Sequence, residues 1–179
     1  MNIFFLSAVA KLCAMLHCDK HVVKMIIEYA QLMSTAHRVL DGTEWYDKTA
    51  NGRRIKRWRM DDEDMEDTLY KASHINHPSA IWARQTSENY KWLYQLWYAL
   101  CKEYTHRYGK THATYEKLAH VLVDMPKNIE VGHRTTVPQA MPDDVKCEDT
   151  IEAYQQYYRK YKKDFARWTK RDIPEFMTA

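Results

Sequence analysis

Apolar residues follow a helical period in the stretch "HCDKHVVKMIIEYAQLMSTAHR", residues 17–38. At about 100° per residue, apolar side chains surround most of the helix and the polar ones share a single sector. That sector contains His17, His21, Lys24, Glu28, Gln31, Thr35 and Arg38. Because a surface helix needs only one apolar side, the pattern predicts a nearly enveloped helix over about residues 9–40, with a left-handed glycine cap at Gly42.

The rest of the chain also favours helices, separated by polar turns. We expect a polar, basic loop over 41–75 and then a long aromatic helix from a turn at 76–78 to Gly109. A helix over 112–123 and an irregular segment over 124–146 follow. The last predicted helix begins at the capping pattern Asp149-x-x-Glu152 and carries aromatic residues as far as Trp168.

The composition agrees with a single helical domain. A chain of 179 residues with no Gly/Ser-rich or Pro-rich linker indicates one domain, and four Gly and five Pro are few for a β-rich fold. The predicted fold is therefore all-α, a compact domain with a largely buried N-terminal helix, a long central helix and a basic, aromatic C-terminal helix. We expect a monomer.

The N-terminal segment "MNIFFLSAVA" is apolar but short, and it carries no basic n-region. It predicts neither a signal peptide nor a membrane span. The four cysteines, Cys13, Cys18, Cys101 and Cys147, have no disulfide-framework spacing, which is typical of a reducing compartment. A cytoplasmic protein is the resulting expectation.

Charge is segregated along the chain, although the net charge is only +3. Two runs, 51–60 and 159–171, interleave basic and aromatic residues, a pattern that suits a polyanion with stackable bases; the alternative is a solvated surface. The acidic run 61–67 neutralises its neighbour or caps a helix. We expect duplex DNA as the partner and the following contacts to it: His17, Arg53, Arg54, Lys56, Arg57, Arg59, His77, Arg84, Arg167, Trp168, Lys170 and Arg171.

A zinc site is one candidate for chemistry, because Cys13, His17 and His21 recur every four residues. The set has no CxxC pair and lacks a fourth ligand, so we expect neither a metal nor another cofactor. The zinc interpretation stays open as an alternative.

Glu28 beside an amine is the second candidate. A carboxylate on an apolar helix can move protons while a neighbouring amine attacks an electrophilic carbon. Lys24 lies one turn away, and the apolar segment that begins at Met1 could fold against this helix. An α-amino group titrates near 8, against about 10.4 for lysine, so the terminus is the better default nucleophile. A simple Lys24–Glu28 ion pair remains the structural alternative.

Two segments of the chain resemble a known family. "DKHVVKMIIEY" (19–29) resembles the Asp-Gln-His-x6-Glu segment in the first helix of the phage pyrimidine-dimer DNA glycosylases, the endonuclease V family. "KWLYQLWYALCKEYTHRYG" (91–109) is similar to the second long helix of that family, with Leu93, Leu100, Glu103 and Arg107 in the matching positions, and "FARWTKR" resembles its basic, aromatic end.

The resemblance implies an all-α enzyme that kinks duplex DNA, attacks the sugar C1′ at a damaged or modified pyrimidine with its N-terminal amine, and cleaves the strand by β-elimination through a Schiff base, without a metal. Glu28 would be the catalytic carboxylate and His21 a DNA-facing catalytic residue. Asn2 stands where the family has a small residue exposed by methionine removal, so the nucleophile would be Met1, or Lys24, or absent. Ile27 and Gln31 replace two family arginines. A non-catalytic nucleic-acid-binding protein on the same scaffold is the alternative.

Overall fold

The computed structural model describes the whole chain, residues 1–179, as one mainly helical unit with a single β-hairpin. In chain order the elements are α1 (Ala10–Leu16), α2 (Asp19–Asp41), β1 (Thr43–Lys48), β2 (Arg54–Arg59), α3 (Glu63–Thr68), α4 (Pro78–Gln85), α5 (Ser87–Tyr108), α6 (Ala113–Leu122), the 3-10 turn η1 (Asp143–Val145), α7 (Thr150–Tyr161) and α8 (Glu175–Thr178). The mainly helical class is confirmed, and the two-stranded hairpin is an element that the prediction does not include.

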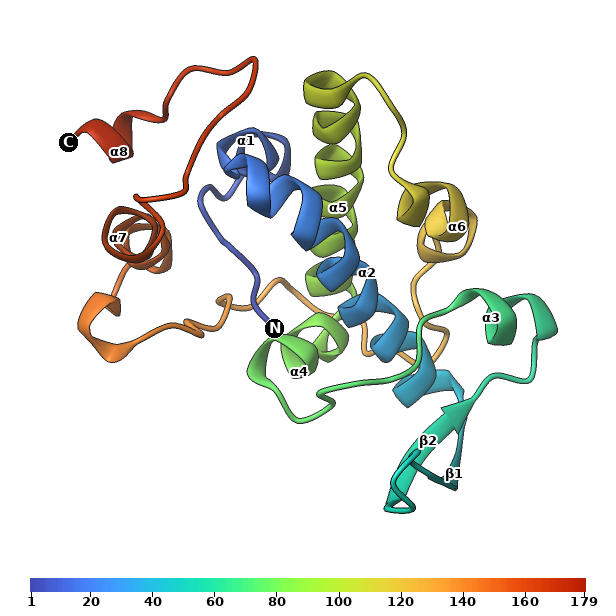
Figure 1. The fold of residues 1–179 in the computed structure, drawn as a ribbon. Helices are drawn as coiled ribbons and strands as arrows, with labels where there is room; N and C mark the ends of the chain where they lie inside the picture. Colours follow the sequence, from blue (N-terminus) through green and yellow to red (C-terminus); the bar gives the residue numbers. More distant parts are fainter.

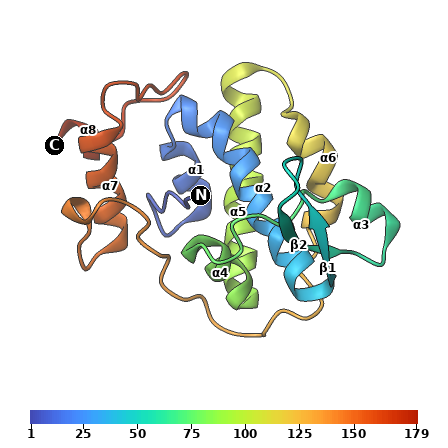
Figure 2. The ribbon, with the colours of Figure 1, turned by 60° about the horizontal axis from the view of Figure 1, so that its bottom comes forward.

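Two long helices, α2 and α5, form the centre of the molecule. They pack against each other, and α4 and α6 pack on them. Trp97 of α5 is fully buried and its indole Nε1 donates to the Ile26 carbonyl oxygen of α2 at 3.0 Å. Figure 1 and Figure 2 both show α1 and the N-terminal segment between this pair and α7. A large apolar core therefore holds α2 on several sides, as the sequence pattern predicts.

The N-terminal segment is part of that core. Its residues 3–6 are all buried. The Phe4 N–H donates to the Tyr29 hydroxyl at 3.2 Å, and the Asn2 amide donates to the Ala140 carbonyl at 2.8 Å. The Tyr154 hydroxyl donates back to the Asn2 side chain at 2.8 Å. These contacts hold the N-terminal segment between Tyr29 of α2 and Tyr154 of α7.

Three predicted helix boundaries are wrong. The helix expected over 9–40 is interrupted at His17 and Cys18, both in extended conformation. The helix expected up to Gly109 is interrupted at Thr86, whose hydroxyl accepts the Asn89 N–H and so caps α5. The last helix ends at Tyr161 rather than near Trp168. Apolar side chains keep their spacing across these helix ends because the residues on both sides pack into the same core, so the periodicity does not show where a helix stops.

Gly42 ends α2, but not in the predicted left-handed conformation, since its φ is −86° and its ψ is 165°. A Cβ at this position would lie 2.5 Å from the Arg38 carbonyl oxygen. Glycine is therefore required here by the close approach of the backbone rather than by a positive φ.

The predicted loop over 41–75 contains the β-hairpin. β1 and β2 pair antiparallel, with Thr43 opposite Arg59 and Lys48 opposite Arg54. Gly52, at the tip, has a φ of +79°, which glycine adopts without strain. Asp62 caps α3 by accepting the Met65 N–H at 2.9 Å, so the helix-capping interpretation of the acidic run is confirmed. The irregular character of 124–146 is confirmed apart from η1.

Two further expectations concern the chain as a whole. No helix combines the length and apolarity that a membrane crossing requires. All four cysteines carry free thiols, in agreement with the absence of a disulfide framework.

Candidate functional site

Glu28 lies in the middle of α2, at the edge of the buried surface. Its side chain is 17% exposed, and its carboxylate lies 3.2 Å from the ammonium of Lys24, which is 69% exposed. The next residue, Tyr29, is fully buried. The ion pair predicted from the i, i+4 spacing is therefore present, and it places an amine directly against a half-buried carboxylate.

The N-terminal amine and His77 belong to the same neighbourhood. Burial lowers the pKa of His77, the positive charges of the Met1 amine and His74 lower it further, and the Glu28 carboxylate opposes them. The Met1 amine and the Glu28 carboxylate therefore each lie within electrostatic reach of His77, although the three groups come from separate segments. We call these groups, with Lys24 and His74, the Glu28 cluster.

The sequence predicts some members of the Glu28 cluster but not all of them. The sequence predicts Met1, Lys24 and Glu28 together and His77 as a DNA contact only. The sequence does not predict His74 as a member of the cluster. Its backbone has a φ of +49°, a feature that no sequence pattern predicts. The His77 ring accepts the Ser79 N–H at 3.1 Å and caps α4, so one ring nitrogen is already used. Neither Glu28 nor Lys24 lines any of the five main cavities.

His21 does not face the solvent, which corrects its predicted role. Its ring is stacked on Phe4, with centroids 4.1 Å apart and planes at 17°, and Nδ1 is hydrogen-bonded to the Tyr158 hydroxyl. Only 6% of the residue is exposed. Burial, followed by the positive charges of His17, Lys162 and Lys24, lowers the pKa of His21 to about 2. His21 is a neutral core residue and not a DNA-facing one.

His17 and the proposed zinc triplet are also part of the core. The His17 ring is completely buried between the Cys13 carbonyl and the Tyr29 hydroxyl, each at 2.7 Å. The Cys13 thiol donates to the Phe4 carbonyl at 3.1 Å, and burial raises the pKa of this thiol to about 12. No three His, Cys, Asp or Glu side chains converge as metal ligands. The zinc interpretation and the DNA contact by His17 are both wrong.

The β-hairpin carries most of the exposed basic side chains that were predicted. It leaves the C-terminal end of α2 and projects away from the helices (Figure 1). The Arg54 guanidinium lies 3.6 Å from the centre of the Tyr46 ring, and Arg59 lies 4.9 Å from that of Trp45. Lys56 pairs with Glu44 at 3.2 Å. The hairpin therefore presents cations on aromatic rings on an exposed ribbon.

Arg57 differs from the other basic residues of the hairpin. Its side chain turns towards the body of the protein, where Nη1 lies 3.5 Å from the Ala72 carbonyl, and its buried Nε has no partner. Arg53, at the tip, and Arg54, Lys56 and Arg59, along β2, are exposed. Four of the five predicted hairpin cations are therefore accessible.

The C-terminal basic run is mostly structural. Trp168 is only 8% exposed, and its Nε1 donates to the Leu16 carbonyl at 3.0 Å, so its predicted DNA contact is wrong. Arg171 binds the carboxylate of Glu103 through two hydrogen bonds, each 2.9 Å long. Arg167 and Lys170 are exposed. They lie towards the N-terminal end of α2, about 35 Å of helix from the hairpin.

Arg84 of α4 has no carboxylate partner in the structure. Its Nη2 donates to the Ile75 carbonyl at 2.7 Å, and its Nη1 is buried without an acceptor. Burial lowers the pKa of this guanidinium. Arg84 therefore ties Ile75, two residues before His77, to α4.

The chain was compared with family models, with curated proteins and with solved structures, and none of them matches it. The class that the fold defines is a mainly helical protein with an exposed basic hairpin. The resemblance to the endonuclease V family stays a prediction that rests on the segments quoted above.

Proposed function

We propose that this protein is a DNA glycosylase, with lyase activity through a Schiff base, that acts on a damaged or modified pyrimidine in duplex DNA. The observation that carries the proposal is the Glu28 cluster, where a half-buried carboxylate lies 3.2 Å from one amine and shares the surroundings of His77 with a second, the N-terminus. An amine and a carboxylate are the two groups that this chemistry requires.

In the proposed reaction the unprotonated amine attacks C1′ of the nucleotide. The C1′–N bond breaks, its electrons leave with the base, and the base takes up a proton. The bound amine loses a proton to the Glu28 carboxylate. The C1′–O4′ bond then breaks, O4′ takes that proton back from Glu28, and the nitrogen lone pair forms the protonated imine. Removal of a C2′ proton then expels the 3′ phosphate, and water releases the amine.

The β1–β2 hairpin supports the DNA-binding part of the proposal. A two-stranded ribbon fits the major groove of B-form DNA, and the exposed Arg53, Arg54, Lys56 and Arg59 suit its phosphates. Tyr46 and Trp45 add ring surfaces on which bases stack. A glycosylase must also extrude its target base from the stack, and a projecting aromatic ribbon suits that task.

Incubation of the purified protein, without added metal, with end-labelled duplexes tests the proposal. The duplexes carry a thymine dimer, an abasic site or no lesion, each with and without borohydride. We expect strand cleavage at the dimer or the abasic site and a covalent adduct trapped by borohydride. Peptide mapping of the adduct distinguishes Met1 from Lys24.

The second candidate function is DNA binding without catalysis. It is favoured by the Lys24–Glu28 pair, in which each charge already has a partner, and by the lack of a main cavity at Glu28. Duplexes that are bound but remain intact and untrapped would overturn the glycosylase proposal and support this alternative.

A further inference from the structure

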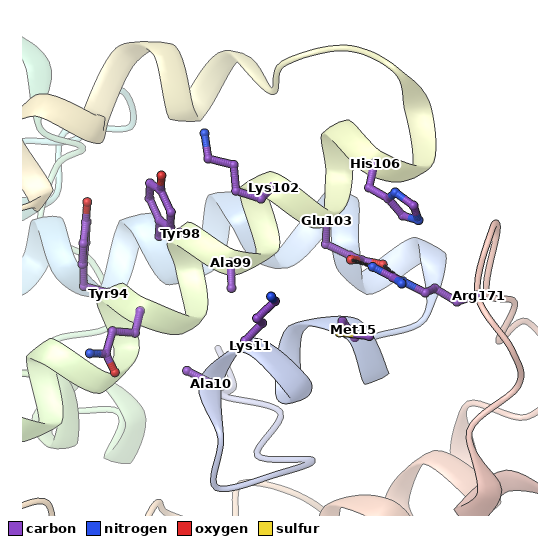
Figure 3. A pocket seen from close by; sticks show the side chains of 11 residues that line it. Ala10, Lys11, Met15, Tyr94, Tyr98, Ala99, Lys102, Glu103, His106 and Arg171 are labelled. Carbon is purple, nitrogen blue, oxygen red and sulfur yellow. Dashed lines mark hydrogen bonds and ion pairs between the residues drawn. The ribbon is translucent and has the colours of Figure 1, made fainter.

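A cavity lies away from the Glu28 cluster, between α1 and α5. Its volume is about 670 Å³, which is within the usual range for small-molecule sites. Figure 3 shows it from close by. The lining residues are Ala10, Lys11, Met15, Tyr94, Gln95, Tyr98, Ala99, Lys102, Glu103, His106 and Arg171. None of them belongs to the Glu28 cluster.

The charge around this cavity is positive. Lys11 extends from α1 towards α5, whereas the Lys102 side chain extends from α5 away from Lys11 (Figure 3), and its ammonium donates to the Tyr115 hydroxyl at 3.3 Å. Glu103 is the only carboxylate of the lining, and its charge is already compensated by Arg107 at 2.8 Å and by Arg171 at 2.9 Å. Despite burial, these two arginines hold the pKa of Glu103 below its usual value. An anionic ligand is therefore favoured.

Arg171 has spare hydrogen-bonding capacity at the edge of the cavity. Its Nε and Nη2 donate to Glu103, whereas Nη1 makes no hydrogen bond within the chain. Its side chain is 30% exposed. A fixed guanidinium with one free N–H edge is well suited to a phosphate oxygen.

Aromatic and apolar surface completes the site. Tyr94 and Tyr98 lie one turn apart on α5, with ring centroids 6.2 Å apart and planes tilted by 35°. Tyr98 is 41% exposed and its ring has the Lys102 ammonium 5.0 Å from its centre. Ala10 and Ala99 leave room between the two helices. Tyrosine rings beside ammonium groups are the surroundings that a planar base with a phosphate prefers.

We propose that the cavity between α1 and α5 binds a nucleotide, with the base against the tyrosine rings of α5 and the phosphate near Lys11 and Arg171. The site does not depend on the proposed glycosylase activity, because the two share no residue. The nucleotide is either a free nucleoside monophosphate or the 5′-phosphorylated end of a strand.

Calorimetric titration of the full chain with thymidine monophosphate tests the proposal. We expect saturable binding that weakens with salt, and weaker binding of both thymidine and inorganic phosphate, because each lacks one half of the recognised chemistry. A 5′-phosphorylated dinucleotide that binds more tightly than the monophosphate assigns the site to strand ends, and the reverse order assigns it to free nucleotides. The absence of saturable binding by either ligand would overturn the proposal.

Two variants localise the binding. We expect Lys11→Gln and Tyr98→Ala each to weaken thymidine monophosphate binding by about tenfold. Lys91→Gln on the same helix and Tyr161→Ala are the matched controls, since Lys91 is exposed and Tyr161 is 43% exposed with a lysine over its ring. Circular dichroism confirms that all four variants are folded. Binding that is equal in the cavity variants and the wild type would place the ligand elsewhere and reject the site.

Discussion

The Lys24 ammonium and the Glu28 carboxylate lie 3.2 Å apart on one face of α2, yet the two side chains differ in exposure, 69% against 17%. A pair with one largely exposed partner stabilises a helix by only a few tenths of a kcal/mol. The fold therefore does not depend on Glu28, and a functional effect of its substitution can be separated from unfolding.

Glu28→Gln should reduce strand cleavage by about 100-fold or more, because the amide cannot accept the proton that a positioned carboxylate accepts. Affinity for the duplex and the unfolding midpoint in urea should stay close to the wild-type values. Single-turnover cleavage of a dimer-containing duplex, together with a binding titration, measures both. Glu88→Gln is the control, since Glu88 forms a helical pair with Lys91 at 3.6 Å that lies on the exposed surface. Full cleavage activity of Glu28→Gln would contradict the catalytic role of Glu28 and leave the Lys24–Glu28 pair with a structural role only.

The identity of the nucleophile gives a second prediction. We expect acetylation of the Met1 amine to abolish the borohydride-trapped adduct, because an α-amino group is more often unprotonated at neutral pH than a lysine side chain. Lys24→Gln should leave the adduct in place. The trapped fraction, read on a denaturing gel, is the measurement. An adduct that survives acetylation but is lost in Lys24→Gln assigns the attack to Lys24 instead.

The exposed cations of the hairpin give a third prediction. Arg54→Gln and Lys56→Gln should each weaken duplex binding and lower the slope of log affinity against log salt by about 0.9, the value for one phosphate contact. The measurement is a binding titration at several salt concentrations. Lys91→Gln, which removes an exposed charge from α5, should leave the slope unchanged. A flat salt response of the wild-type protein would contradict both DNA-binding functions.

The sequence predicts the helices and the Glu28 pair because both depend on local spacing. It does not predict the hairpin, because the charged strand "RIKRWR" lacks the apolar alternation of a half-buried strand. His17 and His21 show the same limit. Their helical spacing places them in the polar sector, but their tyrosine and phenylalanine partners come from residues 4, 29 and 158, and periodicity does not reveal tertiary partners.

Trp168 shows that basic sequence neighbours do not by themselves place an aromatic residue on the surface. Its sequence neighbours Arg167 and Lys170 are exposed, but the indole itself is in the core. Trp168→Ala should therefore destabilise the protein by about 3–5 kcal/mol, the usual cost of removing a large buried ring. Urea unfolding measures this loss, and Arg167→Ala, on the exposed side, should change the stability little. A stable Trp168→Ala protein with weakened DNA binding would restore the tryptophan to the DNA interface.

The buried histidines predict how stability changes with pH. Burial lowers the pKa of His17 and His37 to about 4 and that of His21 to about 2, from an ordinary value of 6.5. Below pH about 6.5 these histidines are therefore protonated in the unfolded chain but not in the folded protein. The stabilisation is fully present above this pH and is lost as the pH falls from about 6.5 towards 4.

Between pH 6 and 5, each of these histidines should contribute up to about 1.4 kcal/mol per pH unit to the slope of unfolding free energy. Urea unfolding at intervals across this window gives the slope. His21→Gln should make the slope shallower even if it lowers stability at pH 7, because it removes one titrating group from the unfolded chain. The exposed His106→Gln is the control.

The pH range from 6 to 5 lies above the range in which Glu103 and Glu66 become protonated, since their arginine and backbone partners hold both pKa values below the ordinary carboxyl range. A stability profile that is flat from pH 6.5 to 5 would mean that the three rings accept protons in the folded state.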